Sequence, residues 1–176
     1  TRTSQACVLR KGKALNEAGQ PWFKTLSLVN PHDVMFYDTD KPGENVQSAG
    51  RTMFEPTATP DDKIYKKKWD VPLSPTLNQP MDASGRPLAH TDYQNSQAML
   101  TGKIPNEKDR WQRMQDYYFN CISDNDRSID IILTELENLG MLDNTIVIMT
   151  ADHGEKLIVR TVEDALNIQI PENANT

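Results

Sequence analysis

The stretch of sequence that decides the fold is Thr145-Ile146-Val147-Ile148-Met149-Thr150-Ala151-Asp152-His153-Gly154-Glu155. Its apolar run is rich in β-branched residues and too short for a helix, so it predicts a strand that is buried on both faces. Asp152 and His153 then follow at the carboxyl end of the strand, where open α/β sheets bind their ligands. A carboxylate and an imidazole on one short turn can serve as two metal ligands. The alternative is a polar loop with a surface histidine, which is the commoner context for an isolated Asp-His pair.

A second segment of the same kind lies near the N-terminus. Residues 23–29 are rich in strand-forming residues and lead directly into Asn30-Pro31-His32-Asp33. Pro31 fixes its own φ and favours extended backbone at Asn30, so we expect a stiff turn that holds His32 in a defined direction. An imidazole presented in this way can hydrogen-bond an oxyanion or transfer a proton to a leaving group. A histidine that is satisfied by neighbouring carbonyl groups is an equally good interpretation of this segment taken alone.

A long helix is expected between the two segments. Its apolar residues recur at steps of three and four and form one face: Trp111, Met114, Tyr118, Ile122, Ile129, Ile132, Leu133, Leu136 and Leu139. Asn106 is the predicted N-cap and Gly140 the predicted end, while polar residues over 123–128 allow a kink or break. With a weaker helix over residues 6–18, helices and strands alternate. This order predicts an α/β fold, with a mainly parallel or mixed sheet flanked by helices.

The two strand ends and the helix between them resemble the sulfatase family of the alkaline-phosphatase superfamily. The resemblance rests on residues 21–33 and on the run from Asp126 to Glu155. In that family a long helix, a short turn and a buried strand place the second pair of metal ligands in this order. The resemblance covers roughly a third of the chain closely and about two thirds loosely, because loops vary more than the elements they connect. It implies an incomplete part of an alkaline-phosphatase-like sheet.

The resemblance also implies roles for three residues. Asp152 and His153 correspond to ligands of the divalent cation that holds the sulfate oxygens. His32 corresponds to the histidine that binds the sulfate ester and helps the leaving oxygen depart, which makes it both a substrate-binding and a catalytic residue. Members of the family often have asparagine at the position of His153, and this histidine affects the choice of metal because calcium prefers oxygen ligands. Calcium is the first expectation and manganese the second.

The nucleophile motif of the family has no counterpart in the sequence. Sulfatases use a cysteine, matured to formylglycine, in a Cys-x-Pro-x-Arg motif that lies N-terminal of the Pro-His segment. Cys7 is followed by Val-Leu-Arg and Cys121 by Ile-Ser-Asp-Asn, so neither cysteine stands in that motif. We therefore predict a fragment from the middle of the catalytic domain that is inactive alone.

The predicted organisation is a partial catalytic domain over residues 1–155 and a divergent or truncated tail over residues 156–176. Within the domain, residues 38–106 form a proline-rich excursion with little periodicity. A segment of this length without regular structure is functional or disordered in most compact domains. It is interpreted either as a substrate loop or as a surface segment that becomes ordered only against the rest of the enzyme.

Composition and charge narrow the classes of function. The net charge of −6 argues against a nucleic-acid-binding surface. No apolar run approaches the ~18 to 20 residues needed to cross a membrane. The sequence begins with Thr1 and shows no signal-peptide pattern, so the compartment stays open. The resemblance favours a periplasmic or secreted full-length enzyme.

The sequence thus predicts a fragment of a metal-dependent sulfuric ester hydrolase that acts on a sulfate ester. The first alternative is a piece of a phosphomonoesterase or phosphodiesterase of the same superfamily, since the nucleophile that distinguishes these classes is not in the sequence. The second alternative is a non-catalytic module.

Overall fold

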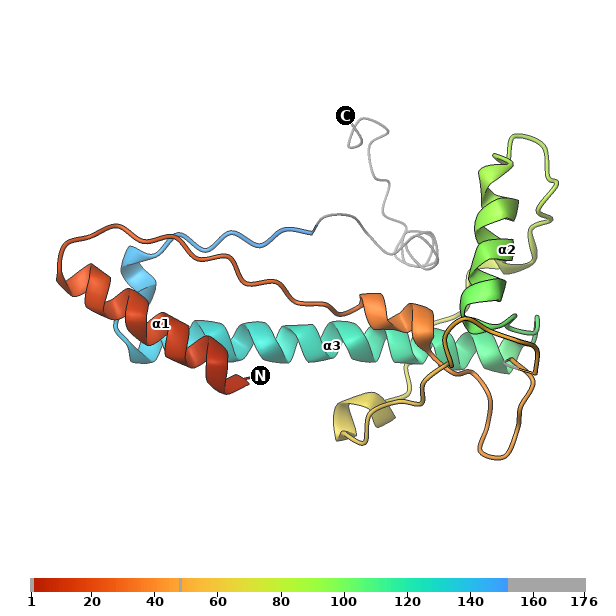
Figure 1. Ribbon diagram of the computed structural model, residues 1–176, viewed down its shortest axis with the longest axis horizontal. Coiled ribbons are helices and arrows are strands. Elements are labelled where there is room, and N and C mark those ends of the chain that lie inside the picture. The colour runs from red at the N-terminus through yellow and green to blue at the C-terminus, as the bar shows by residue number, and fades with distance from the viewer. Residues whose placement is uncertain (1, 48, 152–176) are drawn as a thin grey trace.

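The fold is built around one long helix, α3 (Figure 1). The computed structural model describes residues 2–47 and 49–151. Its helices over these residues are α1 (Arg2–Glu17), η1 (His32–Phe36), η2 (Lys63–Lys66), η3 (Pro75–Asn78), α2 (Ala89–Thr101), α3 (Lys108–Asn138) and η4 (Leu142–Asn144). In Figure 1, α1 lies along the C-terminal half of α3, while α2 stands across the other end of it. None of the described helices is both long enough and apolar enough to span a membrane.

Helix α3 confirms the long helix that the apolar periodicity predicts, and it runs without a break through residues 123–128. The hydroxyl groups of Ser123 and Ser128 donate to carbonyl oxygens one turn earlier, so these polar residues are satisfied within the helix. Gly140 adopts a positive φ of 65° just beyond the last turn, and the Met141 amide bonds back to the carbonyl of Leu136. This is the glycine-terminated helix end that the sequence predicts.

The predicted N-cap of α3 is wrong. Glu107 occupies the N-cap position without a side-chain capping hydrogen bond, and the side chain of Asn106 is used elsewhere. Asn106 donates to the side chain of Asn78 in η3 and accepts a hydrogen bond from the indole of Trp111. The side chain therefore connects the preceding loop to the helix and is not available to cap the first turn.

Two apolar clusters cover the two halves of α3. The first, which we call the aromatic cluster, lies under η1 and consists of Val34, Tyr37, Met114, Tyr117, Tyr118 and Cys121. The second, the α1 cluster, is smaller and consists of Leu9, Leu136 and Met141, with Trp22 and Ile132 among the residues packed against it. The largest part of the core thus lies next to the segment that carries His32.

The predicted α/β fold is wrong. Residues 2–47 and 49–151 contain helices and no strand, and their single parallel β-bridge joins Tyr37 and Thr57, outside both predicted strands. Residues 20–29 and 145–151 run without regular structure, and Phe23 and Ile146 are each 90% exposed. A β-branched sequence favours a strand only where neighbouring strands pair with its backbone and cover its side chains. Neither segment has such a neighbour among the described residues.

The proline-rich stretch over 38–106 contains more structure than its sequence suggests. It includes η2, η3 and the 13-residue helix α2. Amides of Met53 and Phe54 donate to carbonyl groups at the end of α2, so the stretch folds back on itself. The predicted tail over 156–176 lies outside the described residues.

Candidate functional site

The turn at residues 30–32 presents His32 at the surface. The extended segment 20–29 ends there, and η1 begins at His32. The His32 amide donates to the carbonyl of Val29 at 3.1 Å, and the Val34 amide donates to the carbonyl of Pro31 at 3.0 Å. The imidazole is exposed and meets the ring of Phe36 edge-on, with 6.2 Å between ring centroids. The backbone of the turn is therefore fixed while the imidazole stays accessible.

Polar side chains tether this turn to the middle of α3. The side-chain amide of Asn125 donates to the carbonyl oxygen of Asn30. The Asn30 amide in turn donates to the hydroxyl of Tyr65 at 3.2 Å and to the carboxylate of Asp124 at 3.3 Å. Tyr65, from η2, also donates to the same carboxylate at 3.0 Å. Three separate parts of the chain thus meet at the turn, and we call these residues the Asn30 network.

The carboxylate of the Asn30 network is paired with an arginine. Burial, together with the hydrogen bond to Asp124, raises the pKa of Tyr65 to about 12, so its hydroxyl remains a donor at neutral pH. The guanidinium of Arg127 donates to Asp124 and, at 2.9 Å, to Asp62. Hydrogen bonds from a guanidinium to a carboxylate are shorter and stronger than neutral ones, so Asp124 holds its partners firmly. The network therefore acts as a support for the turn and not as a source of a reactive group.

An open cavity of about 410 Å³ lies beside the turn. Its lining residues come from η1, the loop after Glu55 and α3: Asp33, Phe36, Thr57, Ala58, Pro60 and Tyr117. Behind it, Cys121 is fully buried, and burial raises the pKa of its thiol to about 12. A thiol in this state is a poor nucleophile at neutral pH. Cys121 is therefore a core residue, in agreement with its position outside any nucleophile motif.

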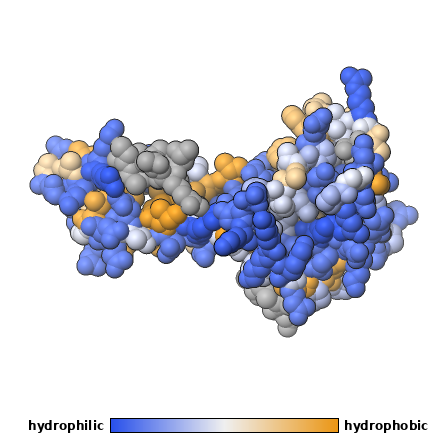
Figure 2. Space-filling view, turned by 90° about the horizontal axis from the view of Figure 1, so that it is seen from below, coloured by the Kyte–Doolittle hydropathy of each residue, from blue (hydrophilic) through white to orange (hydrophobic). Residues whose placement is uncertain are grey.

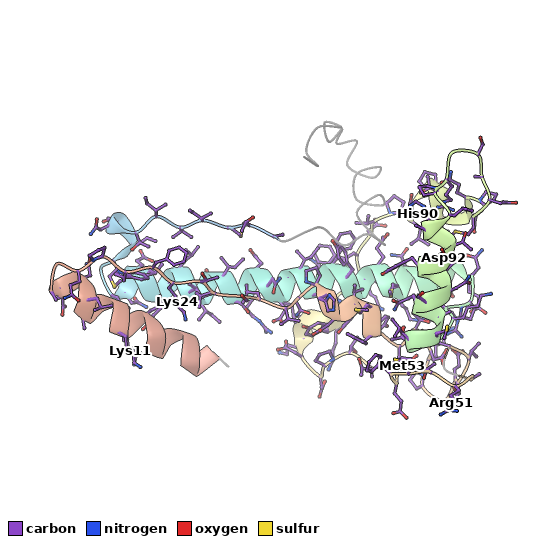
Figure 3. All side chains as sticks on the ribbon, turned by 45° about the horizontal axis from the view of Figure 1, so that its top comes forward. Lys11, Lys24, Arg51, Met53, His90 and Asp92 are labelled. Carbon is purple, nitrogen blue, oxygen red and sulfur yellow. The ribbon has the colours of Figure 1, made fainter. Side chains whose placement is uncertain are left out.

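The predicted metal ligands Asp152 and His153 lie outside the described residues. Segment 145–151, which leads to them, runs along α3 in the same direction as segment 20–29 (Figures 1 and 3). Within the described residues no group of three or more His, Cys, Asp or Glu side chains could hold a metal ion.

Sequence reasoning missed a second polar cluster at the start of α3. Arg110 is 3% exposed and pairs with Asp40, with Glu44 at 3.1 Å and with Glu107 at 2.9 Å. Burial opposes ionisation of Asp40, but hydrogen bonds from the Val46 amide and from Arg110 lower its pKa overall. The signal in the sequence is the run of acidic residues between Asp38 and Glu44. This cluster fixes the loop that follows η1, and it does not include His32.

Comparisons with known proteins point to one family. A family model described as Sulfatase matches residues 3–168. The chain is 29% identical to arylsulfatase K of Canis lupus familiaris over 146 residues, which is 81% of this chain and 24% of that protein. It is 37% identical to an endo-4-O-sulfatase of Bacteroides thetaiotaomicron over 59 residues, 34% of this chain and 12% of the relative. The matched regions thus span a quarter or less of these relatives. No solved structure matches the chain.

Proposed function

Because this chain belongs to the sulfatase family, we propose that it is the part of a metal-dependent sulfuric ester hydrolase that presents the substrate-binding histidine, His32. The observation that carries the proposal is the tether of the Asn30-Pro31-His32 turn to α3 by Asn125 and Asp124. Catalytic groups need to be held in position by their surroundings, and these bonds do so for the backbone of the turn.

His32 is proposed to contact an oxygen of the sulfate ester and to assist departure of the leaving oxygen. A surface imidazole on a fixed turn can donate a hydrogen bond to an anionic oxygen, and in its protonated form it can transfer the proton to the leaving group. The Asn30 network supplies the support for this role, since it fixes the residue two positions before His32.

A divalent cation is proposed to be held by Asp152 and His153, with calcium as the first choice and manganese as the second. The cation would neutralise the sulfate oxygens. One carboxylate and one imidazole are too few donors for calcium, which takes about six to eight oxygen ligands. The ion would therefore be held by further ligands outside these two residues, and this chain alone would bind it weakly.

Turnover by the 176-residue chain is not expected. Neither cysteine stands in a nucleophile motif, and Cys121 is buried with a raised pKa. Groups that only bind and polarise an ester leave the bond-forming step without an attacking atom. The proposed contribution of the chain is binding and orientation of the sulfate group.

The test is a nuclear magnetic resonance titration of the full chain with inorganic sulfate and with phenyl sulfate, on wild type and His32→Ala. His90→Ala is the matched control, since His90 is an exposed histidine on α2 (Figure 3). We expect shifts centred on residues 30–33 that His32→Ala removes and His90→Ala retains. Shifts that survive in His32→Ala would overturn the role of His32.

A parallel assay follows phenol release from phenyl sulfate and phenyl phosphate with calcium or manganese present. No release is expected with either ester. Metal-dependent release that His32→Ala abolishes would show that the chain contains a nucleophile, and the fragment interpretation would then be wrong.

A further inference from the structure

We propose that Arg127, on α3, is a positioning residue for His32. It acts through the carboxylate of Asp124, which in turn holds the side chain of Asn30 at the start of the turn. The positioning part of this proposal rests on the hydrogen bonds of the described residues. Its consequence for sulfate binding rests on the proposed function.

The guanidinium of Arg127 holds two carboxylates at once. Its Nε donates to Oδ1 of Asp124 at 3.1 Å, and one terminal nitrogen donates to the same oxygen. The other terminal nitrogen donates to Oδ2 of Asp62 at 2.9 Å. The hydrogen bonds with Asp62 and with Asp124 raise the pKa of Arg127 above its ordinary value. Because a guanidinium presents its donors in one rigid plane, these bonds fix the orientation of both carboxylates.

The two oxygens of Asp124 have different partners. Oδ1 accepts from Arg127, whereas Oδ2 accepts from the amide of Asn30 at 3.3 Å and from the hydroxyl of Tyr65 at 3.0 Å. A carboxylate is planar, so a donor that fixes one oxygen also fixes the place of the other. Arg127 therefore determines where Oδ2 meets the side chain of Asn30. Since Asn30 lies two positions before His32, the orientation of the guanidinium reaches the turn through two successive hydrogen bonds.

Asp62 anchors the other side of the guanidinium. It is the N-cap of η2, and its Oδ1 accepts from the amide of Ile64 at 3.0 Å. The helical turn η2 is itself bound to α3, because the side-chain amide of Asn120 donates to the carbonyl of Tyr65 at 3.1 Å. Arg127 is thus held by a carboxylate that is already fixed, and it has little freedom to turn away from the Asn30 network.

The exposure of these side chains separates positioning from stability. Arg127, Asp124 and Asp62 are 32%, 23% and 39% exposed. Single ion pairs at partly exposed positions contribute little to global stability, whereas a forked arginine within a network can hold a fixed geometry. Loss of the fork should therefore change the turn at His32 while α3 and the aromatic cluster stay folded.

The first experiment compares Arg127→Lys with wild type by nuclear magnetic resonance of the full chain. The lysine keeps the positive charge and removes the planar fork. We expect the amide of His32 to exchange about three-fold faster or more, since residues in one hydrogen-bond network are coupled, and the imidazole resonances of His32 to shift. Asp62→Asn, which weakens the same fork from its other side, should change the same resonances. Unchanged resonances over residues 30–34 in both variants would overturn the proposal.

Arg113→Lys is the matched control. Arg113 is another forked arginine of α3, and its Nε and a terminal nitrogen donate to the carbonyl of Thr39 at 3.0 and 2.7 Å. Its replacement should leave the resonances of His32 unchanged. Far-ultraviolet circular dichroism checks that each variant keeps its helices. Equal changes at His32 in Arg113→Lys and Arg127→Lys would show a general loss of structure and would overturn the proposal.

A double-mutant cycle tests the route through Asn30. Asn30→Ala removes the side chain that meets Asp124, while the carbonyl at this position can still accept from Asn125. In this background Arg127→Lys should have no further effect on exchange of the His32 amide, because the connecting hydrogen bond is already absent. Effects that simply add would show that Arg127 acts by another route, and the assignment would be wrong.

A titration with inorganic sulfate separates this proposal from the proposed function. Arg127→Lys should weaken sulfate binding at residues 30–33 about three-fold or more, and Arg113→Lys should retain it. A turn that responds to Arg127→Lys in a chain that binds no sulfate would contradict the role of His32 and leave the positioning role in place. Sulfate binding that depends on His32 and is equally tight in Arg127→Lys would contradict only the positioning role.

Discussion

The two halves of α3 differ in what covers them. The N-terminal half is enclosed by the aromatic cluster, η2 and the buried ion pair of Arg110 with Asp40. The C-terminal half is covered by α1 and the small α1 cluster, while segments 20–29 and 145–151 run beside it with exposed apolar side chains. The space-filling view shows the same contrast, with apolar colour on the narrow part of the molecule and a mostly hydrophilic surface on the larger part (Figure 2).

The difference shows what fixes a chain in one conformation. Around the N-terminal half, side-chain hydrogen bonds to backbone groups combine with apolar packing, as at Asn120, whose amide donates to the carbonyl groups of Tyr65 and Lys67. Around the C-terminal half, apolar sequence is present but its burial is incomplete. Burial and polar satisfaction together specify structure more strongly than apolar composition alone.

The largest expected effect comes from the buried charge of the N-terminal half. Arg110→Ala should lower the free energy of unfolding by about 3–5 kcal/mol, because it leaves the carboxylate of Asp40 buried without its partner. Urea unfolding measures the change. Arg51→Ala, at an exposed arginine, is the control and should stay within about 0.5 kcal/mol of wild type. Equal effects of the two variants would contradict the account of this half.

A pair of glycines compares the two halves directly. Gly102 has a φ of 87°, and an added Cβ would overlap the carbonyl oxygen of Gln47, whereas Gly140 has a φ of 65° with no atom within 4 Å of its Cβ position. Gly102→Ala should therefore lower the free energy of unfolding by about 2 kcal/mol or more, and Gly140→Ala should lower it by about 1 kcal/mol. Urea unfolding of both variants gives the comparison. A larger loss of stability in Gly140→Ala than in Gly102→Ala would contradict this prediction.

Thiol chemistry gives a smaller but direct contrast. In a Cys7→Ser background, Cys121 should react with iodoacetamide at pH 8 only after urea is added, because its pKa is raised to about 12 by burial. Ile146→Cys, introduced at a position that is 90% exposed, should react at once. Mass spectrometry reads both rates. Rapid labelling of Cys121 in the native chain would show that the aromatic cluster opens readily.

The same pKa values predict a loss of stability in alkali. Cys121 and Tyr65 have ordinary pKa values of 9.0 and 10.0 and folded values of about 12. Their contribution to stability is complete below pH 9 and is lost as the pH rises towards 12. The urea concentration at the unfolding midpoint should therefore be lower at pH 11 than at pH 8.

The smallest expected effect is that of metal. Millimolar calcium or manganese should barely change the melting temperature, because Asp152 and His153 alone leave a hard cation mostly hydrated. Differential scanning fluorimetry of wild type and Asp152→Ala measures the shift. Since a ligand stabilises by RT ln(1 + [L]/Kd), a shift of several degrees that Asp152→Ala loses would mean that the chain contains a complete metal site.

The sequence predicts α3 and its glycine end because periodicity and capping are local signals. Helix α2 is missed because Ala89–Thr101 is mostly polar and its few apolar residues show little helical periodicity. The two strands are predicted wrongly because a strand needs partners, and strand-forming residues do not report whether partners are present. The same run of β-branched residues occurs in a paired strand and in a segment without a partner.

For the site, the sequence predicts a fixed turn at His32 from Pro31 alone. It does not predict the partners of that turn, since Asp124 and Asn125 lie 94 and 95 residues away from Asn30 along the chain. Their signal was the polar interruption of the apolar face of α3. These polar residues hold the turn, although the sequence alone suggested a kink or break in the helix at this place.

Residue-resolved hydrogen exchange of the full chain tests the central claim. The claim is that the chain is most stable where other residues bury α3, and that the backbones of segments 20–29 and 145–151 are not paired with another strand. We expect slow exchange for residues 114–121 and for Val34, whose amide donates to the carbonyl of Pro31. Residues 23–28 and 146–150, whose amides donate no hydrogen bond within the described part of the chain, should exchange near the rate of an unfolded peptide. Slow exchange in both of these segments would show that their backbones are paired, and it would contradict the account.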